Sequence, residues 1–155
     1  MCRTCPTGRE ASTSLRLILA GLQDAPHHLD RQASLEKSVR LIAQAGRTGA
    51  RLAAFGETWL PGYAFFEFSA SSRARWHAAQ FCIDQAVTNP GPETDALCAA
   101  VRAADMDVVI GVVERDGGTR GTVCCTIMAI GCEGRIMVTH RKLKPTIEER
   151  IARGE

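Results

Sequence analysis

The 155-residue sequence has few aromatic residues, little net charge and no long apolar run. A membrane-spanning helix needs about 20 apolar residues in succession, and no segment of the sequence reaches that length, so we expect no membrane partner. The net charge is +2 and the basic residues are spread along the chain, which gives no electrostatic reason to expect binding to nucleic acid. Internal repeats and low-complexity tracts are also missing. This composition is typical of one ordinary globular domain.

The seven cysteines do not form a disulfide framework, because their number is odd and their spacing is irregular. The first residues are polar and contain no apolar stretch of the kind found in signal peptides, so residues 1–14 are predicted to be a flexible N-terminal extension. Cys2 and Cys5 have redox or metal spacing, but no second pair completes a four-ligand site. We therefore expect a cytoplasmic protein with reduced thiols and no bound metal.

Short apolar runs and one amphipathic periodicity predict five strands and three helices along the chain. Asp30 is a predicted N-cap and Pro92 a predicted first helical residue. The predicted strands are 15–23, 50–55, 106–114, 123–130 and 135–140, and the predicted helices are 30–49, 71–87 and 92–105. The segment 15–23 is apolar enough to predict a buried strand. The order of elements predicts an α/β layered fold that ends in an antiparallel ladder of three strands.

The aromatic residues are few but concentrated, since five of the eight lie between Trp59 and Phe68. Such a concentration indicates a local core or the wall of a pocket. Glu57 stands just before this cluster and directly after a predicted strand, where α/β folds place functional residues. Apolar neighbours would raise the pKa of the Glu57 carboxyl by desolvation and make it a general base near neutral pH. The alternative is a salt-bridged glutamate at a strand end.

A second polar segment, "HRKLKPTIEER" at residues 140–150, also follows a predicted strand. A lysine held beside a carboxylate can stabilise the charge that develops on an intermediate. The alternative is a solvated basic loop, although Pro145 favours a defined turn.

Together "FGETWLPGY" and "HRKLKPTIEER" resemble the two signatures of the nitrilase (carbon–nitrogen hydrolase) superfamily, in its nitrilase and cyanide-hydratase branch. The resemblance runs from Leu15 to the last residue. It implies the N-terminal half of an αββα four-layer sandwich, truncated, with residues 15–155 as the N-terminal portion of the hydrolase domain. It also implies that Glu57 is the general base, that Lys142 stabilises the tetrahedral intermediate, with Lys144 the weaker choice, and that Glu149 is an auxiliary acid.

The family reaction that the resemblance implies converts a nitrile to a carboxylic acid and ammonia through a covalent thioimidate on a cysteine. It requires no cofactor, and the family forms dimers or spiral homo-oligomers. The family cysteine follows the lysine by a few dozen residues, and none of the seven cysteines stands there. Cys124 and Cys125 are adjacent on a predicted strand and point to opposite faces; buried thiols are usually inert, so neither is predicted to be catalytic.

Three alternatives to an acid-forming nitrilase therefore stay open. The chain is an inactive fragment that acts only in assembly or interaction, or it belongs to a cyanide hydratase that releases the amide. An amidase or carbamoylase is less favoured, because "HRKLKPT" resembles the nitrile branch more than the amide branches.

Overall fold

The computed structural model describes residues 17–63, 71–119 and 121–144. Its five strands form one mixed sheet in the order β1-β2-β3-β4-β5. The strands are β1 (Leu19–Gly21), β2 (Leu52–Ala54), β3 (Asp107–Arg115), β4 (Val123–Gly131) and β5 (Arg135–Arg141). The first three strands are parallel, whereas β3, β4 and β5 are antiparallel. Both the α/β fold and the predicted antiparallel ladder are thereby confirmed.

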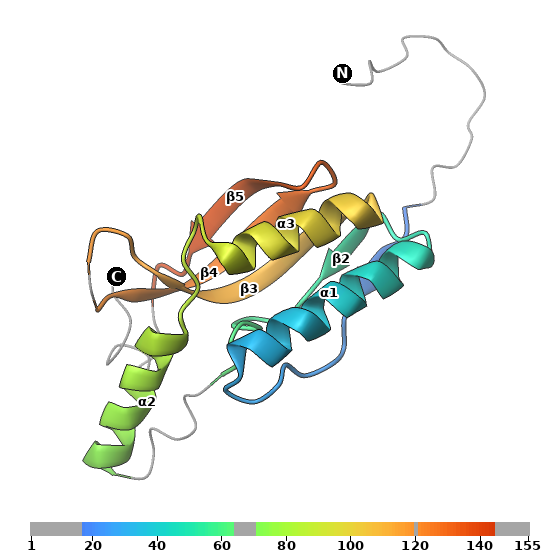
Figure 1. Ribbon diagram of the computed structural model, residues 1–155. Coiled ribbons are helices and arrows are strands. Elements are labelled where there is room, and N and C mark those ends of the chain that lie inside the picture. The colour runs from blue at the N-terminus through green and yellow to red at the C-terminus, as the bar shows by residue number, and fades with distance from the viewer. Residues whose placement is uncertain (1–16, 64–70, 120, 145–155) are drawn as a thin grey trace, which may run out of the picture.

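Two helices, α1 (Arg31–Arg47) and α3 (Pro92–Ala104), lie side by side on one face of the sheet (Figure 1). The Asp30 carboxylate caps α1 by accepting a hydrogen bond from the Ala33 N–H at 2.9 Å, which satisfies one of the free N–H groups of the first turn. Pro92 opens α3 as predicted. The sequence signals for helix ends were therefore sufficient at both positions.

The main core lies between these two helices and the sheet. Its largest fully buried side chains include Trp59, Ile42, Leu60, Leu97, Met106, Ile110, Met128 and Ile130. The third helix, α2 (Ser72–Gln85), stands at one end of the sheet (Figure 1) and covers a smaller apolar cluster around Cys82, Val113 and Val123. None of the helices in the described ranges is long and apolar enough to cross a membrane.

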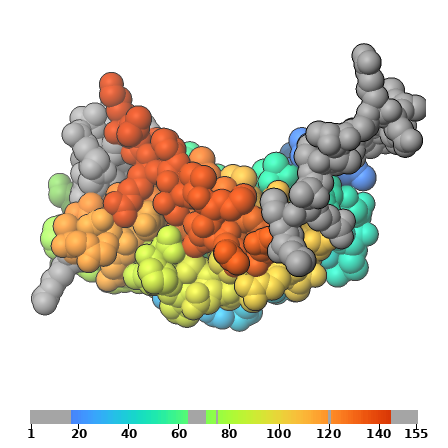
Figure 2. Space-filling model, turned by 90° about the horizontal axis from the view of Figure 1, so that it is seen from above, coloured from blue at the N-terminus to red at the C-terminus, as the bar shows by residue number. Residues whose placement is uncertain are grey.

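On the sheet face turned away from α1 and α3, the described residues leave part of β4 and β5 uncovered, and large apolar side chains are exposed there. Ile127 is 46% exposed and Val138 is 57% exposed. The prediction of a buried strand at 15–23 is wrong in this respect: β1 comprises only Leu19–Gly21, and Leu19 is 61% exposed. Apolar content indicated burial, but within the described ranges β1 and parts of β4 and β5 are covered on one face of the sheet alone. In the space-filling view, the orange and red atoms of the β4–β5 hairpin lie at the surface of the molecule, beside the yellow atoms of α3 (Figure 2).

Candidate active site

Glu57 lies in a short loop that follows β2, runs beside β3 and bulges over Gly111 in the middle of that strand. The loop is tied to β3 at both ends, because the Phe55 N–H donates to the Val109 carbonyl at 2.9 Å and the Leu60 N–H donates to the Gly111 carbonyl at 3.3 Å. Between these bonds the backbone leaves the sheet plane. The loop therefore presents Glu57 at a defined place over the sheet.

Gly111 makes this close approach possible. A Cβ at residue 111 would lie 2.6 Å from the Gly56 carbonyl oxygen, 2.7 Å from the Thr58 nitrogen and 2.8 Å from the Glu57 Cα. Contacts of this kind with backbone atoms leave no room for any larger residue. The residue after Glu57, Thr58, has a φ of 50°, a conformation that is strained for a β-branched side chain. The loop is thus held in an unfavourable backbone shape directly beside Glu57.

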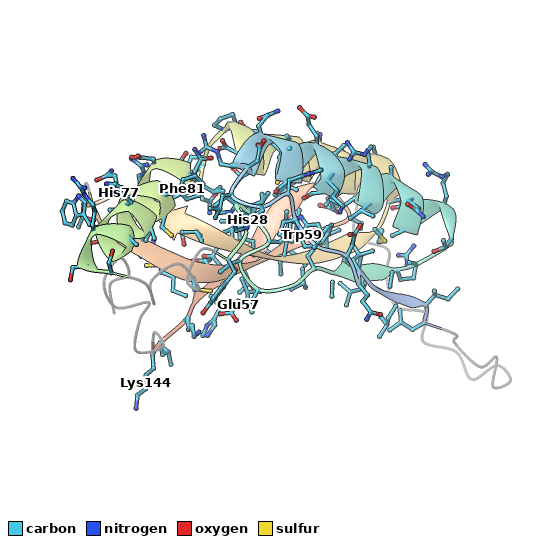
Figure 3. All side chains as sticks on the ribbon, turned by 90° about the horizontal axis from the view of Figure 1, so that it is seen from below. His28, Glu57, Trp59, His77, Phe81 and Lys144 are labelled. Atoms are coloured by element: carbon cyan, nitrogen blue, oxygen red, sulfur yellow. The ribbon has the colours of Figure 1, made fainter. Side chains whose placement is uncertain are left out.

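Trp59 and Glu57 point to opposite sides of the sheet (Figure 3). Trp59 is buried under α1, packs edge-on against Phe55 with ring centroids 5.0 Å apart, and donates from its indole N–H to the Ser38 hydroxyl at 2.7 Å. It belongs to the core and does not cover Glu57, whose side chain is 52% exposed. The prediction that the aromatic cluster desolvates Glu57 is therefore wrong for Trp59; the three phenylalanines of that cluster lie outside the described residues.

Lys142 directly follows β5 and reaches the same side of the sheet as Glu57. Its backbone N–H donates to the Cys125 carbonyl at 2.8 Å, so Lys142 and Cys125 are neighbours on one face. This register depends on a one-residue irregularity in β5: Ile130 pairs with Ile136, but Ala129 pairs with Val138. Because a one-residue shift moves every following side chain to the other face, the bulge decides that Lys142 stands beside Cys125.

The residue before Lys142 is fixed on the opposite face. Arg141 makes a two-pronged ion pair with Glu114, with nitrogen–oxygen distances of 3.0 and 3.2 Å, and a further ion pair with Asp116 at 3.0 Å. The Glu114 carboxylate also accepts from the Thr126 hydroxyl at 2.6 Å and is nearly buried. Hydrogen bonds to Glu114, together with its charge, raise the pKa of the Arg141 guanidinium above its ordinary value, so this group stays charged. These ion pairs hold the last residue of β5 in place, directly before Lys142.

Glu57 and Lys142, which lie 85 residues apart in the sequence, come together in the structure. The Lys142 Nζ lies 3.1 Å from the Glu57 Oε1; the Lys142 side chain is 32% exposed and the Glu57 side chain 52% exposed. Lys144, the weaker lysine candidate, projects away from the sheet and from Glu57 (Figure 3). Glu149, the third predicted site residue, lies outside the described residues.

A cavity of about 460 Å³ opens above this pair. Its apolar wall is formed by Phe55, Val109, Ile127 and Leu143, and the polar groups that line it are Glu57, Cys125, His140 and Lys142. Cys125 is a site residue that the sequence did not predict. Its Sγ lies 3.1 Å from the Glu57 Oε1. The only signal for it is the alternation along β4, which leaves open whether Cys124 or Cys125 faces the site. Within the described ranges, no group of three or more histidine, cysteine, aspartate or glutamate residues is arranged to hold a metal ion.

Proteins of known structure share this fold. An amidase from Nesterenkonia sp. AN1, solved as a double mutant in complex with acrylamide, superimposes with a TM-score of 0.64 at 18% sequence identity over 95% of this chain and 50% of the amidase. At this level of identity the likeness concerns the fold. It confirms the predicted nitrilase-like layer architecture, with this chain equivalent to about half of that protein.

Curated relatives match at the level of sequence. "Nitrilase 2" from an unknown prokaryotic organism is 48% identical over 134 residues, which cover 86% of this chain and 43% of the relative. An aliphatic nitrilase of Rhodococcus rhodochrous is 34% identical over 140 residues, which cover 88% of this chain and 37% of the relative. The chain therefore spans less than half the length of these relatives. The family model for carbon–nitrogen hydrolases matches residues 19–153, and the chain accordingly belongs to the carbon–nitrogen hydrolase family.

Proposed function

We propose that this chain supplies the base and the charge-stabilising group of a nitrile-hydrolysing enzyme, with residues 15–155 as the N-terminal portion of its catalytic domain and residues 1–14 as an extension. The observation that supports the proposal is the 3.1 Å contact between the Lys142 Nζ and the Glu57 Oε1 at the mouth of a largely apolar cavity. The similarity to nitrilases favours a nitrile over an amide as substrate.

In the proposed reaction a cysteine thiol adds to the nitrile carbon. Glu57 accepts the thiol proton, the new carbon–sulfur bond gives a thioimidate, and the nitrogen becomes protonated. A first water molecule adds to the thioimidate, ammonia leaves with the aid of a returned proton, and a second water molecule releases the carboxylic acid and the thiol. The Lys142 ammonium stabilises the tetrahedral intermediates by its fixed positive charge. Glu149 is proposed as an auxiliary acid in these proton transfers.

The thiol is proposed to come from the part of the family's length that this chain does not span. The 155-residue chain by itself is then inactive, and ammonia release from a simple nitrile will not exceed background. In a protein that spans the full length of the family, we expect Glu57→Gln or Lys142→Ala to abolish ammonia release, whereas Lys144→Ala retains part of it because Lys144 projects away from Glu57. Full activity of Glu57→Gln, or a larger loss from Lys144→Ala than from Lys142→Ala, would contradict these roles.

The uncovered sheet face favours a second candidate, in which the chain acts only through assembly. Ile127 and Val138 are half-exposed on neighbouring strands of this face, and apolar patches of this kind are typical of interfaces. In the proposed enzyme the face is covered by a second sheet, and whole subunits form homo-oligomers. If the chain acts only in assembly, Glu57→Gln will leave the behaviour of the complex unchanged, whereas a charge introduced at Ile127 will disrupt it.

A further inference from the structure

Cys125 lies in the same cavity as Glu57 and Lys142, and it contacts the carboxylate directly. Its Sγ is 3.1 Å from the Glu57 Oε1, and the residue is only 6% exposed. The Lys142 Nζ reaches the same oxygen atom, also at 3.1 Å. Two donors from the β4–β5 side of the cavity therefore meet one oxygen of the carboxylate.

The backbone leaves the Cys125 side chain no other direction. Cys125 pairs with Val113 on β3, and its carbonyl accepts from the Lys142 N–H on the other side. A residue hydrogen-bonded between two strands keeps its side chain on one face, and here that face carries Glu57. The adjacent Cys124 points to the opposite face, near Arg141.

We propose that Cys125 is a positioning residue for Glu57: its thiol donates a hydrogen bond to the carboxylate, orients it towards Lys142 and favours its ionised form. A thiol is a weak donor, but a hydrogen bond to a charged acceptor is stronger than one to a neutral acceptor. Donors to the ionised form lower the pKa of a carboxyl group. The inference that Glu57 is thereby kept ready to accept a proton rests on the proposed function, whereas the hydrogen bond itself does not.

Among the described residues that line the cavity, the groups other than Glu57 that can ionise are Cys125, His140 and Lys142. Lys142 and His140 come from the end of β5 and its continuation, and Cys125 comes from β4. Val109 and Gly111 of β3 cannot ionise, and neither can Phe55 and Gly56, which precede Glu57. The removal of the thiol takes away its hydrogen bond to Glu57 and keeps the Lys142 and His140 side chains in place.

The test is a titration of the Glu57 carboxyl carbon in the ¹³C-glutamate-labelled 155-residue chain, with the resonance assigned by its loss in Glu57→Gln. In Cys125→Ala we expect the pKa of Glu57 to rise by about half a pH unit, because a donor to the ionised form is lost. Cys125→Ser keeps a donor and should restore the wild-type titration. Cys124→Ala is the matched control, since that residue is equally buried but faces away, and it should leave the titration unchanged. Circular dichroism checks the fold; if Cys125→Ala unfolds, Cys125→Val removes the donor at a similar volume.

The proposal is overturned if Glu57 titrates as in the wild type when Cys125 is alanine or valine. It is also overturned if serine shifts the titration as much as alanine does, because the effect then follows volume and not the donor. In a full-length hydrolase, Cys125→Ala should shift the acid limb of the kcat–pH profile towards higher pH by about the same half unit. If Glu57→Gln keeps full activity while the titration results hold, the proposed function fails but the hydrogen bond stands.

Discussion

The Glu57 loop and Gly111 are so close that a Cβ on residue 111 would lie 2.8 Å from the Glu57 Cα. The absence of a side chain at one position of β3 thus sets how deeply the loop sits over the sheet. Any residue larger than glycine must push the loop away, and with it the carboxylate that contacts Lys142.

Gly111→Ala should therefore lower the free energy of unfolding by about 1–3 kcal/mol, as is usual for over-packing, and separate Glu57 from Lys142. Chemical denaturation measures the first effect and a crystal structure of the variant the second. Gly117→Ala is the control, because a Cβ there has no atom within 4 Å. Equal stability of the two variants would show that the loop adapts without cost.

Removal of the Arg141 guanidinium should affect both stability and the site. Arg141→Met leaves the nearly buried Glu114 carboxylate with the Thr126 hydroxyl as its remaining hydrogen-bond partner within this cluster. We expect the free energy of unfolding to fall by about 1–3 kcal/mol. The loss is smaller than for a fully buried pair because Arg141 is half-exposed. The end of β5 should also loosen, so Lys142 amide hydrogen exchange should accelerate. Arg135→Met is the control, since Arg135 and its partner Glu133 are both exposed and 3.9 Å apart; its effect should stay within about 0.5 kcal/mol. Unchanged exchange at Lys142 in Arg141→Met would contradict the bracing role.

The buried hydrogen bond from Trp59 to Ser38 predicts non-additive costs. Ser38→Ala should cost about 1–3 kcal/mol, because the indole N–H loses its acceptor in the core. In a chain that already contains Trp59→Phe, the same serine substitution should cost about 1 kcal/mol less, since no indole is left unpaired. Urea denaturation followed by far-ultraviolet circular dichroism gives the four free energies. Additive costs would mean that the hydrogen bond contributes nothing.

The uncovered sheet face should cause the 155-residue chain to self-associate. Replacement of Ile127 and Val138 by threonine keeps β-branched residues on the strands but reduces the apolar area of the face, so the sedimentation coefficient at high concentration should fall towards that of a monomer. Trp76→Gln is the control, because Trp76 is also exposed but lies on α2. A monomeric wild-type chain, or an equal effect of Trp76→Gln, would argue against association through this face.

Local patterns predicted most of the secondary structure because each element has its own signal. The Asp30 cap, Pro92 at the start of α3 and the apolar runs that become β3 and β4 all depend on neighbours in sequence. The two sequence motifs also pointed to Glu57 and Lys142 separately, as polar residues that follow strands. That the two side chains touch is a property of the sheet order, which brings the ends of distant strands together.

The sequence by itself determined the element types, the family and two candidate site residues. The tertiary structure decided how exposed Glu57 is, because exposure depends on which face of the sheet is packed, and apolar content cannot distinguish a strand covered on both faces from one covered on a single face. It also decided which of two adjacent cysteines joins the site. A one-residue bulge lies between the Ala129–Val138 and Ile130–Ile136 pairs and places Lys142 beside Cys125. A strand register of this kind is set by hydrogen bonds between segments that no local pattern describes.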